Sequence, residues 1–118
     1  MIRSMTAIRQ EHRHLDVACE LDHAEAGARS AEWEQLRIDN GLGAEPVAGG
    51  ARLWLRLSAR QTAEDLVRRE AECCGFLDLE LAKDGDRLRL ELTSPVPQAG
   101  PVIACLVGLE PDCTLPCC

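Results

Sequence analysis

Aromatic residues are scarce in this 118-residue sequence, which contains two Trp, one Phe and no Tyr. Proteins that bind single-stranded nucleic acid stack bases on aromatic side chains, so the scarcity disfavours that class. Positive charge is also short, because 13 Lys and Arg face 20 Asp and Glu and the net charge is −7. An acidic surface repels phosphate backbones and anionic lipid. We therefore expect no nucleic-acid binding by this chain alone and no membrane association.

Long apolar runs are missing as well. No stretch approaches the roughly 18 consecutive apolar residues that a transmembrane helix needs. The first residues, MIRSMTAIRQEHRHLD, lack the apolar core of a signal peptide. Nucleotide-binding motifs and the common hydrolase motifs are absent, so no organic cofactor is indicated. These absences predict a cytosolic protein without a membrane anchor.

The length of the chain suits one domain, and its apolar fraction of 46% supplies a core. Residues 1–13 are polar and predict a flexible arm, residues 14–110 a single α+β domain, and residues 111–118 a Cys-rich tail. Alternation and helical periodicity predict elements in the order β-α-β-α-β-β-α. Their expected ranges are strand 15–21, a helix to about residue 40, strand 53–57, a helix from about 62 to 74, strands 77–81 and 88–92, and an apolar helix within 101–109. Residues 41–50 are predicted to form a turn-rich segment.

The predicted sheet is about four-stranded and largely antiparallel, with the helices packed on one face. Its most specific part is the hairpin around Asp84-Gly85, a dipeptide typical of two-residue turns. A two-residue loop at these positions pairs Leu81 with Leu88 and places Glu80 opposite Arg89. All the leucines of both strands then share one face.

Cysteine is abundant by contrast, with seven residues. An odd number cannot be fully paired within a monomer, and the reducing cytosol disfavours structural disulfides. We therefore expect metal-binding or buried thiols in place of a disulfide framework. Cys19 and Cys105 lie in apolar stretches and are expected to be core residues.

Glu70, Cys73 and Cys74 form the first candidate metal site. Glu70 stands three and four residues before the two cysteines, so one side of a helix would carry all three. Glu70 also interrupts an otherwise apolar stripe, and a carboxylate there needs a partner, a metal or a raised pKa. The alternative is that Glu70 pairs with the arginines around Arg69 at the rim while both cysteines pack as small hydrophobes.

Cys113, Cys117 and Cys118 form the second candidate group. Small thiolate sites use ligand spacings of a few residues, and a tail has no packing reason to hold three thiols. The alternative is a tail that simply oxidises.

The stretch EAECCGFLDLELAKDGDRLRLELTSP, with ARLWLRLSARQTAEDLVRR before it and PVIACLVG after it, resembles a known family. It is similar to a small uncharacterised bacterial domain, common in actinobacteria, that occurs alone or fused to MerR-type transcriptional regulators. Its most specific part here is Glu72-Cys73-Cys74-Gly75-Phe76. Because such regulators sense metals, redox stress or small molecules, the resemblance implies an effector-binding or sensing role.

Three hypotheses follow. The first is a thiolate protein that binds Hg(II), Cu(I), Zn(II) or As(III) for sensing, buffering or detoxification. The second is a small effector-binding or interaction domain, whose leucine-rich core forms a pocket or a homodimer face and whose cysteines are structural. The third is a thiol-dependent enzyme, which predicts an exposed, low-pKa cysteine beside an acid such as Glu70.

Overall fold

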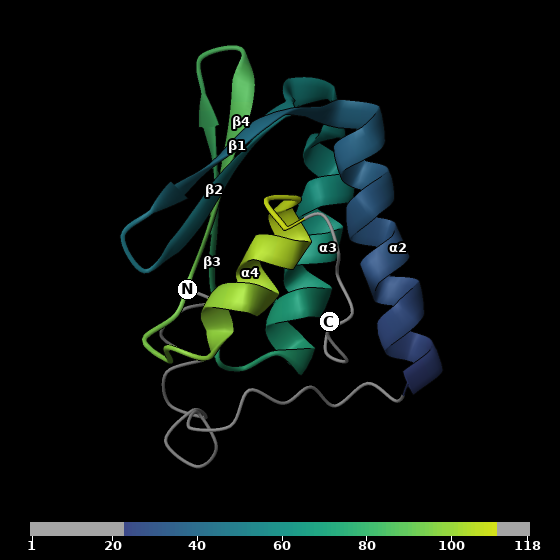
Figure 1. The fold of residues 1–118 in the computed structure, drawn as a ribbon. Helices are drawn as coiled ribbons and strands as arrows, with labels where there is room; N and C mark the ends of the chain where they lie inside the picture. Colours follow the sequence, from purple (N-terminus) through teal and green to yellow (C-terminus); the bar gives the residue numbers. More distant parts are fainter. Residues whose placement is uncertain (1–22, 111–118) are drawn as a thin grey trace.

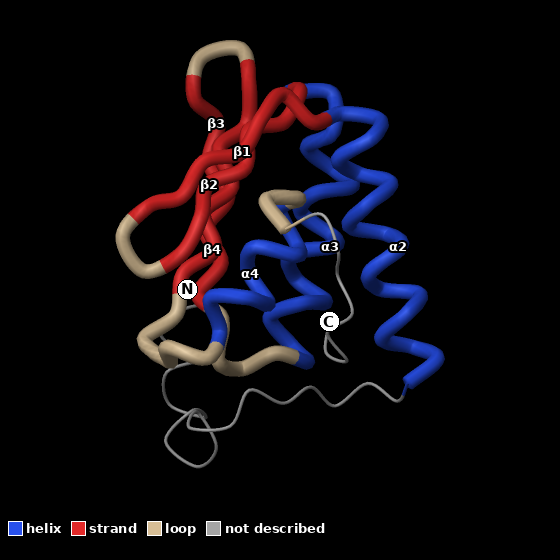
Figure 2. The backbone as a smooth tube through the Cα atoms, in the orientation of Figure 1, coloured by secondary structure: helices blue, strands red, loops and turns tan. Residues whose placement is uncertain are grey.

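The computed structural model describes residues 23–110, in which three α-helices pack on one four-stranded antiparallel sheet (Figures 1 and 2). In chain order the elements are α2 (His23–Asn40), β1 (Gly41–Val47), β2 (Gly50–Arg56), the short 3-10 turn η1 (Leu57–Ala59), α3 (Arg60–Cys73), β3 (Asp78–Asp84), β4 (Arg87–Thr93) and α4 (Ala99–Val107). The strand order is β1-β2-β4-β3. The helices gather on one face of the sheet, so the predicted α+β fold class is confirmed.

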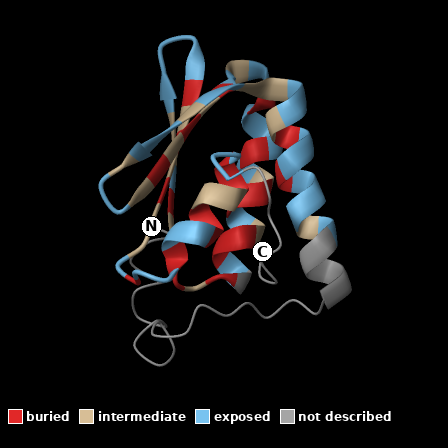
Figure 3. Cartoon of the chain, viewed as in Figure 1, coloured by how far each residue is buried: buried red, intermediate tan, exposed pale blue. Residues whose placement is uncertain are grey.

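The core lies between this sheet face and the helices (Figure 3). Strands β2 and β4 pair in antiparallel register with Leu53 opposite Leu90 and Leu55 opposite Leu88. All four side chains are buried, because alternate residues of a strand point to the same face. Burying each leucine contributes about 1.5–3 kcal/mol, so these central pairs anchor the fold.

The outer face of the sheet is polar and solvated, as one face of an antiparallel sheet can be. Trp54 is half-buried there, with the Arg87 guanidinium 3.7 Å from its ring centroid. Its indole N–H donates a hydrogen bond to Glu45 at 3.2 Å. Arg52 donates to Glu45 and to Glu91, at 3.0 and 2.8 Å. These contacts place Trp54 within a network of charged side chains on the outer face of the sheet.

The hairpin of β3 and β4 forms as predicted, but its predicted register is wrong by two residues. Leu81 pairs with Leu90, and Glu80 lies opposite Glu91 instead of Arg89. The two-residue loop is Gly85-Asp86, with Gly85 at a positive φ of 67°. A shift of two residues leaves every leucine on its original face, so the burial pattern alone could not distinguish the two registers.

The predicted turn-rich segment 41–50 is also wrong, because most of it forms β1. This edge strand contains Pro46 and two glycines, which are poor strand formers. An edge strand tolerates proline because one row of its backbone groups has no partner strand. The register of β1 against β2 shifts between Gly41 and Gly43, and Gly43 has a φ of 139°. The strand predicted at 15–21 lies outside the described residues.

The apolar stripe predicted for α3 is confirmed, since its members are all buried: Ala63, Leu66, Val67, Glu70, Ala71 and Cys74. No side chain caps the start of α3. On α2 the buried positions are Trp33 and Leu36, whereas Ile38 is 69% exposed. Within residues 23–110, none of the helices combines the length and apolar character needed to cross a bilayer.

Candidate functional site

Glu70 is the one charged side chain that is fully buried in the described part of the chain, with no exposed surface. It occupies the core-facing stripe of α3 because it follows Leu66 and Val67 at helical spacing. A buried carboxylate is costly unless hydrogen bonds and opposite charge compensate for lost hydration. The partners of its two oxygens therefore define the site.

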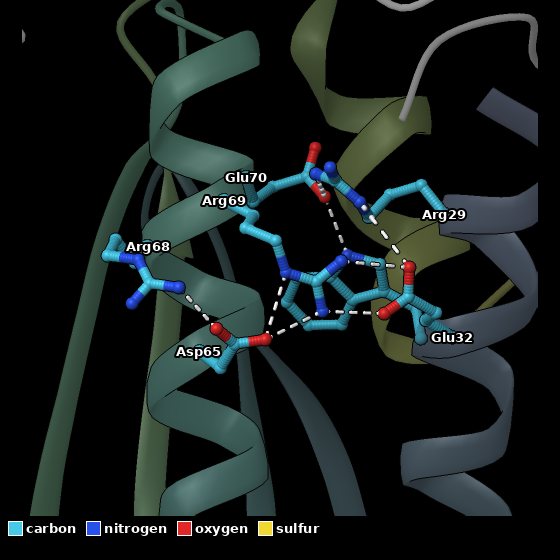
Figure 4. A network of polar contacts seen from close by, with 7 residues as sticks. Arg29, Glu32, Asp65, Arg68, Arg69 and Glu70 are labelled. Carbon is cyan, nitrogen blue, oxygen red and sulfur yellow. Dashed lines mark hydrogen bonds and ion pairs between the residues drawn. The ribbon is translucent and has the colours of Figure 1, made fainter. Parts of the chain in front are cut away.

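Helix α2 supplies the partners of one carboxylate oxygen. The Trp33 indole N–H donates to Glu70 Oε1 at 2.7 Å, and Arg29 Nη1 lies 3.5 Å from the same oxygen. Arg29 and Trp33 are four residues apart, so one face of α2 presents both to α3. Figure 4 shows Arg29 reaching from α2 toward Glu70 on α3. Glu70 is thereby a buried polar link between the two helices.

The second carboxylate oxygen faces sulfur. Glu70 Oε2 lies 3.0 Å from Cys74 Sγ, and Cys74 is completely buried. The Cys74 backbone N–H also donates to the Glu70 carbonyl at 2.8 Å, which fixes the two residues one helical turn apart. A thiol would donate its proton to Oε2, whereas a disulfide sulfur has no proton to donate. When the Cys74 sulfur is part of a disulfide, a hydrogen bond between Oε2 and Sγ therefore requires a proton on the Glu70 carboxyl group.

Two of the described cysteines, Cys74 and Cys105, are in disulfide form in this structure. Cys105 is half-buried on α4, so it is less enclosed than the expected core position. The expectation that the thiols stay reduced therefore does not hold for these two residues. Any chemistry of the Cys74 thiol begins with its reduction.

A network of ion pairs at the rim joins α2 to α3 beside this pair of residues (Figure 4). Arg69 donates to the two carboxylate oxygens of Glu32 at 2.6 and 3.0 Å, and also contacts Asp65 at 2.9 Å. Arg68 also pairs with Asp65. The hydrogen bond from Arg69 lowers the pKa of Glu32. Glu70 does not reach this rim to pair with Arg69 as expected: it is fully buried, and its side chain contacts Trp33 and Arg29 of α2 and Cys74 at the end of α3.

Burial raises the pKa of Glu70, and the bonds from Trp33 and Arg29 offset only part of that rise. Its folded-state pKa therefore lies above the ordinary value of 4.5. The neutral carboxyl is favoured by the fold, so the stability that Glu70 contributes is complete below the unfolded-state pKa. It is lost as pH rises through the folded-state pKa.

We expect the difference in unfolding free energy between the natural protein and Glu70→Gln to fall as pH rises from about 4 to 7. Glutamine keeps the shape and cannot ionise, so it isolates this one group from the other carboxylates. Urea unfolding of both proteins across this pH range measures the difference. A constant difference, or one that grows with pH, would contradict the raised pKa.

The structure brings together two of the six predicted metal ligands, Glu70 and Cys74. The Cys73 side chain and the tail residues Cys113, Cys117 and Cys118 lie outside the described part. Within residues 23–110, no group of three or more Cys, His, Asp or Glu side chains could hold a metal ion. The described residues therefore provide a pair of donors, one sulfur and one oxygen.

Sequence reasoning missed Trp33 and Arg29 as parts of this site. The signal was present, because a buried indole needs an acceptor for its N–H and α2 places Arg29 one turn before Trp33. Helical spacing predicts a face of α2 that is widened by Trp33 and Leu36 and otherwise consists of Ala24, Ala28, Ala31, Gln35 and Ile38. Trp33 and Leu36 are buried, whereas Ala28, Ala31, Gln35 and Ile38 are exposed.

Comparison with protein-family models, curated proteins and solved structures finds no match to this chain.

Proposed function

We propose that this chain binds a thiophilic metal ion through thiolate ligands, for sensing, buffering or detoxification, with Cys74 and Glu70 as two of its ligands. The observation that carries the proposal is the 3.0 Å contact of a buried sulfur with a buried carboxylate oxygen on one helix face. When both groups are deprotonated they repel each other in a low-dielectric site. A bound cation removes that repulsion, and thiolate ligands favour Hg(II), Cu(I), Zn(II) or As(III).

The remaining ligands in this proposal are Cys73 and the tail cysteines, Cys113, Cys117 and Cys118. Two donors are too few for a closed site, since structural zinc sites use four. Cys73 adjoins Cys74 at the end of α3, where the helix terminates and the backbone of Cys74 leaves helical geometry. Binding requires Cys74 in its reduced form.

Titration of the fully reduced protein under argon with Hg(II), Cu(I), Zn(II) and As(III), followed by native mass spectrometry and thiol counting, tests this function. We expect one ion to bind at a fixed stoichiometry, with affinity that rises with pH because thiolate ligation releases protons. Cys74→Ser should abolish tight binding. Glu70→Gln should weaken it by about tenfold or more, comparable to the loss of an oriented ligand contact.

The matched control is Cys105→Ser, which removes one thiol from α4 and leaves the Cys74 and Glu70 pair intact. We expect Cys105→Ser to bind the ion as the natural protein does. Truncation of residues 113–118 distinguishes tail ligation from a site made by other residues. Binding that depends only on total thiol content, and falls equally in Cys74→Ser and Cys105→Ser, would refute the proposal.

The resemblance to domains fused to MerR-type regulators supports a sensing role for such binding. It equally supports the second hypothesis, an effector-binding or interaction domain with structural cysteines. The thiol-enzyme hypothesis receives less support from Cys74, because an enzymatic nucleophile must be reached by its substrate and Cys74 is fully buried.

A further inference from the structure

A cavity of about 310 Å³ lies between the β1–β2 turn, the loop after β4 and helix α4. Its walls include Ala51 of β2, Val96 of the loop, and Ile103 and Ala104 of α4, with Leu109 at the end of the described chain. Glu70 and Cys74 are not among its lining residues, so the cavity is separate from the candidate metal site. Its volume stands at the lower limit of ordinary ligand pockets, which restricts any ligand to a small molecule.

Among residues 23–110, those that line the cavity carry no ionisable side chain, although 28% of the whole chain is charged. The one hydroxyl among these described lining residues belongs to Ser94, whose Oγ accepts a hydrogen bond from the Val96 N–H at 3.1 Å. The hydroxyl proton remains as a single side-chain donor. A charged group of a ligand that packs against these walls would find no opposite charge among the described lining residues, which disfavours its burial there.

The start of α4 does not supply an anion site either, because its first backbone donors are already used. The Ala99 N–H donates to the Val96 carbonyl at 3.0 Å, and the Gly100 N–H donates to the Pro97 carbonyl at 3.2 Å. The next residue, Pro101, has no N–H. Phosphate and carboxylate ligands, which depend on free N–H groups at a helix start, are thus excluded by the local hydrogen bonding.

We propose that this cavity binds a small, neutral, mainly apolar molecule. Apolar walls favour such a ligand through buried surface, and the Ser94 hydroxyl can donate to one acceptor on it. This inference is independent of metal binding, because neither Cys74 nor Glu70 contributes to the walls.

Two fluorescent probes that differ by one charged group test the ligand class directly. N-phenyl-1-naphthylamine is neutral, and 8-anilinonaphthalene-1-sulfonate is the same ring system with an added sulfonate. We expect the neutral probe to bind the full chain at least about tenfold more tightly, which corresponds to about 1.4 kcal/mol. Equal binding of the two probes, or tighter binding of the sulfonate, would overturn the proposed class.

Two substitutions that add bulk at lining residues test the location. A Cβ on Gly100 would meet no heavy atom within 4 Å, and Gly100 does not have a positive φ. Gly100→Leu should therefore project into open space and weaken the neutral probe by about tenfold or more. Ala104→Leu, one turn later on the same helix, provides an independent test with the same expected loss.

Matched control variants show whether probe binding depends on this cavity in particular. Ser30→Leu adds a leucine to an exposed position of α2, outside the lining, and should leave probe binding unchanged. Cys74→Ser should also leave it unchanged, so failure of the metal proposal and failure of this one are distinguishable. Thermal melting establishes that each variant is folded. Unaltered probe binding in a folded Gly100→Leu or Ala104→Leu protein would refute the cavity as the site.

Discussion

Gly50→Ala should strongly destabilise the domain, at a cost on the order of 3 kcal/mol or more. A Cβ at Gly50 would lie 1.8 Å from the Leu92 carbonyl oxygen and 2.8 Å from Thr93 Cα, both backbone atoms of β4. Gly50 is paired with Thr93 in the sheet, so the strands must separate to admit a methyl group. The clash is steric, because Gly50 is not among the glycines with positive φ.

Urea unfolding followed by tryptophan fluorescence measures this effect. Gly100→Ala is the matched control, since it adds the same methyl group where no heavy atom lies within 4 Å. In a helix this change should be neutral or stabilising by up to about 1 kcal/mol. Similar unfolding midpoints for Gly50→Ala and the natural protein would show that β2 and β4 do not approach as closely as described.

The central sheet could be predicted from sequence because its leucines repeat every second residue in β2, β3 and β4. The same regularity concealed the register of the hairpin. The observed register pairs Leu81 with Leu90 and Leu79 with Leu92 but places Lys83 opposite Leu88, so matching leucine to leucine favoured the other register. The difference lies in the turn, where Gly85 adopts positive φ at the first loop position and Asp84 pairs with Arg87.

Strand β1 was missed because its formation depends on tertiary contacts. Gly41 to Val47 has no alternating apolar pattern and contains proline, so local preference argues against a strand. Its pairing with β2 is supported by contacts across the strands, including Glu45 opposite Arg52. Such contacts become visible only when the partner strand and its register are known.

At the candidate site, too, some features could be predicted from local sequence, and others depend on how the helices pack. Glu70 could be identified because a charge within an apolar stripe is anomalous in the sequence itself. Its closeness to Cys74 follows from helical spacing of four residues. Its bonds from Trp33 and Arg29 depend on how α2 packs against α3, which the helical spacing of α2 does not specify.

Glu70→Leu should lower the unfolding free energy by about 3 kcal/mol near pH 4, where the contribution of the neutral Glu70 carboxyl is complete, because it leaves buried donors without an acceptor. Leucine fills a similar space but cannot accept the Trp33 indole N–H, which donates to Glu70 at 2.7 Å inside the core. Arg29, whose side chain is only 11% exposed, loses the same carboxylate. An unsatisfied buried donor alone costs about 1–3 kcal/mol.

Glu70→Gln is the control that separates hydrogen bonding from charge. Its amide oxygen can still accept from Trp33, and its NH₂ group can donate toward the Cys74 sulfur. We expect Glu70→Gln to retain most of the stability that Glu70→Leu loses, as measured by urea unfolding of the two variants with disulfides intact. Trp33→Phe should remove the unsatisfied donor, so the cost of Glu70→Leu should be smaller in that background. If Glu70→Leu is as stable as the natural protein in both backgrounds, the buried carboxylate contributes nothing to joining α2 and α3, and its retention in the core would rest on the chemistry of Cys74 alone.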